Sequence, residues 1–517
     1  MDNINQNIPW QSGEVRPGYV EVVPKPAFPT GKGELIFGVL TLAFSLLLCN
    51  SLLFAGADLG FGVGLIGTML CACGYLRGRG YRPDRYAGAL LGLCLVIAGS
   101  FVRSSDGGLK FWMVCVLLAV PSLALCLTAG KNRRCPDGFL SLLDSPRTLF
   151  GLGFGRLGQS ARGIREAFGA AGALGKKGGA VVLGLLIAVP LLAVMIPLLM
   201  FADAAFEGLV ELLPDFQGDE ILTTALLGIP LGWVLYTRTT ALHHVPREEK
   251  APKARKGLNH LTVNTVLTAV ALLYVVYLIS QLAYFLGGFS GILPEGYTRA
   301  QYARRGFFEM AWLCAINLSV IALSVGLVSA RGRAPRSTRI ICLFLGLVTL
   351  FLVAAASAKM FLYIGANGLT RLRVLTEVFM LWLALTTVFV CVWLFRPKLP
   401  YMKPVLLTGL ALCAGLMWAD VDTQVARYNV RAYQEGRLET VDLRHLAGLN
   451  AGAVPYIEEL TRDSDPEIAQ TARDILENYD LPDRDLRGWN YTWARARDIL
   501  EEYRLKEAAE AQREGST

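Results

Sequence analysis

The feature that most constrains this chain is a series of long apolar runs, with charged residues confined almost entirely to the segments between them. Runs of about 17–25 apolar residues are long enough to cross a bilayer as helices. Inside lipid the backbone polar groups must bond within the protein, which leaves only helices or a closed barrel. A barrel would show alternating segments of roughly ten residues. We therefore predict an all-α polytopic bundle of eleven spans, near residues 35–55, 58–76, 86–102, 110–129, 179–202, 221–237, 261–287, 307–329, 339–363, 376–395 and 404–419.

The distribution of charge separates a polar tail from the membrane region. Residues 420–517 carry 21 acidic and 13 basic residues, a net charge of −8, whereas residues 1–419 carry 21 acidic and 37 basic residues, a net charge of +16. We therefore place a boundary at residue 420. Residues 1–34 contain prolines and acids before any apolar run, unlike a signal peptide, and are expected to form a flexible cytoplasmic N-terminus.

Loops rich in lysine and arginine alternate with loops poor in both, and this alternation predicts the orientation of the spans. The loops after the second, fourth, sixth and eighth spans are rich in both residues, and the loop after the fifth span, 203–220, has neither. Basic loops stay in the cytoplasm. We therefore expect a multi-pass protein of the bacterial inner membrane with a cytoplasmic N-terminus and, after eleven spans, an extracytoplasmic tail.

The sequence of the tail predicts a small helical domain. Ser464-Asp465-Pro466-Glu467 combines a capping residue, a first-turn proline and an early acid, as helix starts do. The octet 472–479 recurs as 496–503 with one difference. These octets suggest two similar helices, as in a helical repeat, and a chance match of common helix formers remains the alternative.

Small residues indicate where spans pack closely. Gly60, Gly64 and Gly67 are spaced to let two helix backbones approach, and so are Gly88 and Gly92. Ten of the eleven cysteines lie in or beside apolar runs, where cysteine acts as a small hydrophobe.

Sequence motifs indicate no catalytic residue, cofactor, metal or nucleic-acid partner. Gly153-x-Gly155-x-x-Gly158 matches a dinucleotide fingerprint, but no strand is expected before it. His243 and His244 are adjacent, so on a helix they point about 100° apart. The partners expected are the lipid bilayer and an envelope protein bound through the tail.

One group of ionisable residues lies at the predicted outer ends of the eighth, ninth and tenth spans. Such groups are costly at membrane depth and suggest function. The alternative is that the basic side chains snorkel to the interface while the acids favour helix starts. This candidate outer-face cluster consists of Arg304, Arg305, Glu309, Lys359, Arg371, Arg373 and Glu377.

Three stretches resemble a known family when taken together: Tyr302 to Glu309, Gly368 to Arg373, and Ala426-Arg-Tyr-Asn429. They are similar to the bacterial membrane family called domain of unknown function 4173 (DUF4173), related to DUF4153. The resemblance covers roughly residues 180–480 and leaves out the first four spans. That family has no established activity, so the resemblance implies an architecture and no catalytic residue.

Three functions are compatible with this sequence. A non-enzymatic envelope sensor, scaffold or assembly factor accounts for the acidic tail and the absent motifs. A secondary transporter is the first alternative, although no inverted repeat or broken helix marks a midplane site. A lipid-linked glycosyltransferase is the second, with Asp58 after the first span as its acid, although that short loop offers no second carboxylate.

Overall fold

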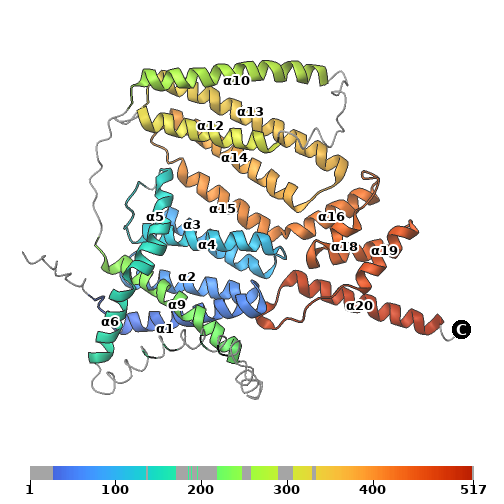
Figure 1. The fold of residues 1–517 in the computed structure, drawn as a ribbon, viewed down its shortest axis with the longest axis horizontal. Coiled ribbons are helices and arrows are strands. Elements are labelled where there is room, and N and C mark those ends of the chain that lie inside the picture. Colours follow the sequence, from blue (N-terminus) through green and yellow to red (C-terminus); the bar gives the residue numbers. More distant parts are fainter. Residues whose placement is uncertain are drawn as a thin grey trace, which may run out of the picture.

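The structure is a computed structural model that describes residues 27–135, 138–170, 218–246, 258–288, 307–328 and 334–514, together with positions 184, 188, 195 and 199. All the regular secondary structure in these residues is helical, and turns and coil connect the helices (Figure 1). The predicted fold class, a polytopic bundle of helices with a small helical tail, is confirmed.

The membrane region is built from long helices and a few short turns of helix. The long helices are α1 (Lys32–Asn50), α2 (Leu59–Gly78), α3 (Arg85–Gly99), α4 (Gly107–Thr128), α9 (Gly218–His244), α10 (His260–Gly288), α12 (Phe307–Val328), α13 (Arg336–Asn367), α14 (Arg371–Phe395) and α15 (Met402–Ala419). The shorter elements are η1 (Ser51–Ala55), η2 (Ser100–Val102), η3 (Phe139–Leu143), α5 (Asp144–Pro146), η4 (Arg147–Gly153), η5 (Phe154–Arg156) and α6 (Leu157–Ala170).

Ten helices among the described residues are long and apolar enough to cross a bilayer. Each falls on one of the predicted spans, and the predicted span at 179–202 lies outside the described residues. The last helix, α15, has 18 residues and runs to the start of the tail.

At the other end of the chain Phe28 is buried and its amide donates to the carbonyl of Gln159, so the predicted N-terminal extension is packed from about this residue onward.

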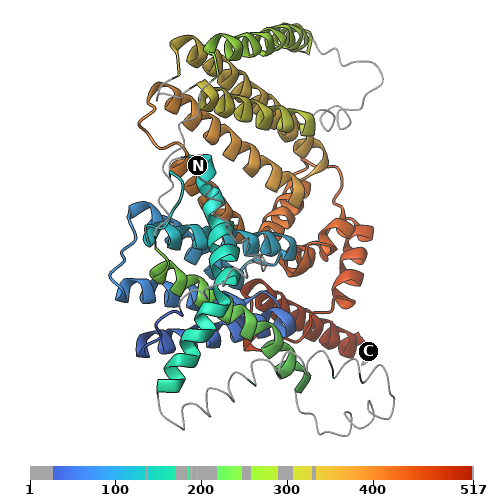
Figure 2. The ribbon, with the colours of Figure 1, turned by 60° about the vertical axis from the view of Figure 1, so that its left-hand side comes forward.

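The first bundle contains α1 to α4, α9 and α15 (Figures 1 and 2). Two of the predicted packing glycines explain how closely α1 and α2 approach. A Cβ atom on Gly64 would lie 2.8 Å from Cβ of Leu48, and one on Gly67 would lie 2.2 Å from the Phe44 ring. Among the described residues, a Cβ on Gly88 or Gly92 would meet nothing within 4 Å, so the same prediction is wrong for the described surroundings of α3.

The second bundle contains α10, α12, α13 and α14, and α14 packs on α15 of the first bundle. Its interior holds a short chain of polar groups. The Tyr274 hydroxyl donates to Oδ1 of Asn317 over 2.8 Å, and the Asn317 amide donates to Oγ1 of Thr349 over 3.1 Å. Pairing of this kind removes the cost of burying each group among apolar side chains.

The tail forms α16 (Val421–Gln434), α17 (Leu443–Ala447), η6 (Asn450–Ala453), α18 (Val454–Leu460), α19 (Pro466–Glu477), η7 (Leu486–Gly488) and α20 (Tyr491–Glu514). The two similar octets lie in α19 and α20, and both helices pack on α18. Ala472 and Ala496, the first residues of the octets, are both buried.

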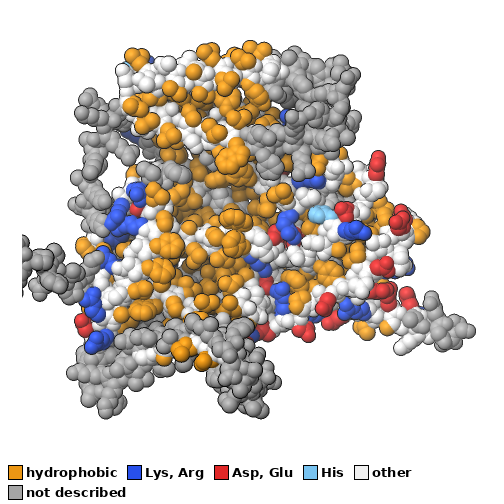
Figure 3. Space-filling model, in the orientation of Figure 1, with side chains coloured by type: hydrophobic (Ala, Val, Ile, Leu, Met, Phe, Trp, Pro, Cys, Tyr) orange, Lys and Arg blue, Asp and Glu red, His pale blue; other side chains and the backbone are white. Residues whose placement is uncertain are grey.

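The tail and the first bundle share one hydrophobic core. A single cluster of buried side chains continues from α2, α3, α4 and α15 into α16, α18, α19 and α20. Figure 3 shows the same arrangement from outside, with apolar side chains between a basic edge on the left and the acidic tail on the right. The tail is therefore docked on one end of the bundle.

Candidate functional site

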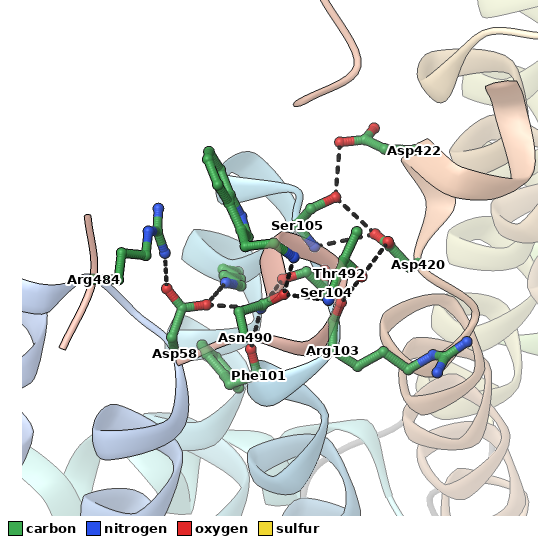
Figure 4. Close-up of polar contacts among 12 residues, drawn as sticks. Asp58, Phe101, Arg103, Ser104, Ser105, Asp420, Asp422, Arg484, Asn490 and Thr492 are labelled. Carbon is green, nitrogen blue, oxygen red and sulfur yellow. Dashed lines mark hydrogen bonds and ion pairs between the residues drawn. The ribbon is translucent and has the colours of Figure 1, made fainter. Parts of the chain in front are cut away.

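The tail meets the membrane region at a network of polar side chains that we call the tail junction. The network brings together the α1–α2 connection, the α3–α4 connection, the first turn of α14, the α15–α16 corner and the segment before α20. Figure 4 shows the part of it that contains Asp58, Asn490 and Asp420. Its members are Asp58, Ser105, Asp106, Lys110, Arg371, Asp420, Asp422, Asn450, Arg484, Asn490 and Thr492.

Asp58 is the buried acid at the centre of one half of the junction. Its side chain precedes α2 and is only 1% exposed. Oδ1 accepts from Nζ of Lys110 over 2.5 Å and from the Asn490 amide over 2.8 Å. Oδ2 accepts from the guanidinium of Arg484. Two tail residues and one membrane-helix residue therefore occupy both oxygens of this carboxylate.

Lys110 is the buried cation that Asp58 neutralises. It lies in the first turn of α4 and is 6% exposed, so its ammonium group has little access to water. A buried charge is tolerated only when it is paired and hydrogen-bonded. Asp58 supplies the opposite charge, and Arg484 approaches the same carboxylate from the partly exposed side, above the Trp493 ring at 4.2 Å.

Asn490 joins the tail to two membrane connections and also starts α20. Its amide group donates to the carbonyls of Phe101 and Ser104 over 3.1 and 2.9 Å, in addition to Asp58. Its Oδ1 accepts from the amide of Thr492 over 3.0 Å. An asparagine before a helix satisfies amides that have no partner within the helix. One side chain thus fixes both the start of α20 and its position on the bundle.

Asp420 turns the chain from α15 into α16. Its φ of 51° is left-handed, a conformation that aspartate tolerates better than most residues. Oδ1 accepts from the Ser105 hydroxyl over 2.9 Å, and Oδ2 lies 2.8 Å from the Thr492 hydroxyl. The corner between the last span and the tail is therefore bound to the α3–α4 connection and to α20.

Arg371 is the basic centre of the other half of the junction. Nε and Nη2 of its guanidinium donate to the two oxygens of Asp422 over 2.7 and 2.8 Å. Nε also lies 3.1 Å from Asp106, the residue that caps α4. Burial raises the pKa of the Asp422 carboxyl, while Arg371 and the Asn450 amide act in the opposite direction. This bidentate pair connects α14 of the second bundle to the tail.

Two of the three stretches that carried the family resemblance, Gly368 to Arg373 and Ala426 to Asn429, meet beside this pair. Residues 302–306 of the third stretch lie outside the described residues. The Asn429 side chain accepts from the Leu369 amide over 2.6 Å and donates to the Leu369 carbonyl over 2.8 Å. Gly368 precedes it with a φ of 73°, and a Cβ there would lie 2.7 Å from Oδ1 of Asn429. Glycine at this position therefore permits both the turn and the contact.

The candidate outer-face cluster is distributed over several environments. Arg304 and Arg305 lie outside the described residues, and Glu309 lies in α12, where the structure describes its backbone only. Arg371 pairs with Asp422 in the tail and with Asp106 at the start of α4. Arg373 donates to the carbonyls of Asn367 and Gly368, and its guanidinium covers the Tyr363 ring at 4.3 Å.

The two remaining members, Lys359 and Glu377, lie in the second bundle. Lys359 is half-buried on α13. Glu377 is half-buried on α14, and its Oε1 is buried without a hydrogen-bond partner among the described residues. Arg371, Arg373 and Glu377 thus begin one helix without forming one network in the described contacts.

The contacts of the tail junction are suited to holding the tail in position on the bundle. Asp58, the acid considered for glycosyl transfer, is inaccessible, and both its oxygens already accept hydrogen bonds. Across the described parts of the chain no group of His, Cys, Asp and Glu side chains could hold a metal ion. Sequence analysis identified Asp58 and Arg371 but missed Lys110, Asp422 and Asn490. Lys110 could have been found, because a lysine in the first turn of a span is an ionisable group at membrane depth.

Comparison with known proteins gives one match. A family model described as "Domain of unknown function (DUF4153)" matches residues 87–460, which is 374 of the 517 residues. The match includes the third and fourth predicted spans, which the sequence resemblance had left out. No curated protein and no solved structure matches the chain. Arg371, Asp106 and Asp422 lie within the matched region, whereas Asp58, Arg484 and Asn490 lie outside it.

We predict that Asp58→Asn destabilises the folded protein by about 3–5 kcal/mol, because it leaves the Lys110 ammonium buried without a counter-charge. Asp58→Asn combined with Lys110→Met should cost less than the single substitution. The measurement is equilibrium unfolding in mixed detergent micelles. Asp485→Asn, which removes an exposed partner of Arg487, is the control and should change stability by less than about 1 kcal/mol. A double variant less stable than Asp58→Asn would contradict a paired role.

Proposed function

We propose that this chain, which belongs to the DUF4153 family, is a non-enzymatic membrane scaffold that holds its tail rigidly at the bilayer surface to bind another envelope protein. The observation that carries the proposal is the tail junction. A tail needed only as a soluble appendage would require a linker, whereas this one follows α15 directly at Asp420. Its polar contacts reach back to residues more than 400 positions earlier, at Asp58.

The rigidity of the tail has a functional consequence. Binding costs conformational entropy whenever a mobile domain must be ordered, and a domain that is already fixed avoids that cost. The shared hydrophobic core holds the tail helices on the bundle, and the junction sets their position. A platform of this kind suits an assembly factor, which must present one surface at a defined height above the membrane.

The charge of the tail suggests the chemistry of the partner. Residues 435–467 carry eight acidic and three basic residues, a net charge of −5. Glu439, Glu459 and Glu467 are exposed. Complementary charge increases the association rate and rejects partners of the same sign. We therefore expect the partner to present a basic surface.

The orientation that we propose places the tail outside the cytoplasm. The tail contacts the α1–α2 and α3–α4 connections and the start of α14, and these are the loops poor in lysine and arginine. Of the basic loops, the described parts of those after α2 and α4 lie at the opposite end of the bundle, where Arg79 pairs with Glu34 at the start of α1 and Lys131 donates to the carbonyl of Val245 after α9. This arrangement agrees with retention of basic loops in the cytoplasm.

A secondary transporter remains the second candidate, and the second bundle is what favours it. Polar groups inside a membrane bundle commonly mark solute or ion paths. Tyr274, Asn317 and Thr349 form such a group. They are hydrogen-bonded to one another, however, and bonding of this kind equally serves to hold α10, α12 and α13 together.

The scaffold proposal is tested by photo-crosslinking in living cells. We expect a crosslinking amino acid at Thr440 or Ser464, both exposed in the acidic stretch, to capture the same protein. Glu439→Lys with Glu459→Lys should abolish the product, because the acidic surface is reversed. Glu166→Lys, an exposed acid on α6, controls for a change of charge elsewhere. A crosslinker at the lipid-facing Leu273 on α10 should not capture that protein. Products that survive the reversal, or appear equally from Leu273, would refute the proposal.

The proposed orientation is tested separately with reporter fusions. Fusions at Pro83, Lys253 and Pro335 should report the cytoplasm, and fusions at Asp215 and after Thr517 should report the outside. An alkaline phosphatase reporter, which is active only outside the cytoplasm, paired with a cytoplasm-active reporter at each site gives the measurement. A cytoplasmic report from the fusion after Thr517 would reverse the placement of the tail.

A further inference from the structure

A groove runs between α1 and α2 at the end of the first bundle opposite the tail. It encloses about 390 Å³. Its walls are mainly apolar and include Ile36, Phe37, Leu40 and Cys71. Ile36 is 62% and Leu40 is 46% exposed, so the groove opens on the face of the bundle that meets lipid. In a membrane such a groove is filled by lipid chains, because water is excluded from the hydrocarbon region.

The groove exists because α1 and α2 are in close contact at one end only. Near the tail, Gly64 and Gly67 are covered by Leu48 and Phe44. Two to three turns further along α2, a Cβ on Gly74 or Gly78 would meet no atom of the described part of the chain within 4 Å. The glycines of α2 therefore serve helix packing near the tail and leave open space at the far end.

The open end of the groove is bordered by basic side chains. Arg79 lines the groove. Lys32, Arg77, Arg82 and Arg85 are exposed within a few residues in sequence of lining positions, and with Arg79 and the acids Glu34 and Asp84 they give this end of the two helices a net charge of +3. Figure 3 shows Lys and Arg side chains along the left edge of the first bundle, away from the tail. The apolar channel thus leads to a positively charged rim.

Arg79 is held in place at the mouth of the groove. Its guanidinium pairs with the buried carboxylate of Glu34 and lies over the Tyr75 ring at 5.5 Å. The Tyr75 hydroxyl donates to the same carboxylate over 3.1 Å. Glu34 is satisfied by these contacts and by the Gly31 amide. The acid that neutralises Arg79 is therefore inside the protein, and the remaining basic residues of the rim face outward.

We propose that this groove binds one anionic phospholipid, with an acyl chain along Gly74 and Gly78 and the phosphate at the basic rim. Apolar walls alone would accept any lipid chain, and it is the rim that selects a negatively charged headgroup. Basic pockets between membrane helices recognise anionic headgroups in this way. Guanidinium groups also form strong, charge-assisted hydrogen bonds with phosphate. The site is independent of the tail and of the partner proposed for it.

The test is native mass spectrometry of the purified full-length protein with chain-matched phosphatidylglycerol and phosphatidylcholine in equal amounts. The wild type should retain one phosphatidylglycerol in preference to phosphatidylcholine. Arg77→Gln with Arg82→Gln should reduce that preference by at least about tenfold, because each basic residue near the surface contributes to the attraction. Arg427→Gln with Arg431→Gln removes the same charge from exposed positions in the tail and should leave the preference unchanged.

A second pair of variants tests the channel itself. Gly74→Leu should fill the groove and remove the retained lipid without lowering the melting temperature, because the new Cβ meets no described atom within 4 Å and leucine is the better helix former. Gly92→Leu, the same substitution at an exposed and equally open position on α3, should retain the lipid. Equal retention of both lipids by the wild type, or undiminished phosphatidylglycerol on Gly74→Leu, would overturn the proposal.

Discussion

The arrangement of this protein depends on a lysine that is buried where a membrane helix begins. Removing an ammonium group from water costs several kcal/mol, and the cost is offset only by a well-placed opposite charge with further hydrogen bonds. Asp58 provides that charge to Lys110, and the tail completes the site through Arg484 and Asn490. The ion pair is formed by two membrane helices, but its carboxylate is fully satisfied only when the tail is docked.

Stability and position have different sources in this fold. The continuous hydrophobic core supplies a driving force that increases with apolar area but is not directional. Buried ion pairs seldom add much net stability, because desolvation consumes most of the gain, and their best-attested use is to select one arrangement. Asp58 and Arg371 have that role here. Asp58 connects the tail to α4, and Arg371 connects the tail to α14. The two bundles and the tail therefore meet at one region, the tail junction.

Hydropathy was enough to identify the spans, because a bilayer imposes length and apolarity on each helix separately. The packing at Gly64 and Gly67 was also predictable, whereas a Cβ on Gly88 or Gly92, which have similar spacing on α3, would meet no atom of the described residues within 4 Å. Spacing along one helix does not reveal which neighbour it will meet. The same limit applies to Arg371. The sequence placed it beside the acids of the spans, but its partner Asp422 lies 51 positions away in the tail, and no local pattern encodes that distance.

The central claim is that the tail occupies one fixed position on the membrane bundle. Electron paramagnetic resonance measures it directly, as the distance distribution between spin labels at Leu53 and Glu501 in lipid nanodiscs. Unnatural amino acids should carry the labels, because the chain has eleven free cysteines. We expect a single narrow distribution in the wild type and a broad one in Asp58→Asn. A broad distribution in the wild type would show a tail that moves freely, and would contradict the account.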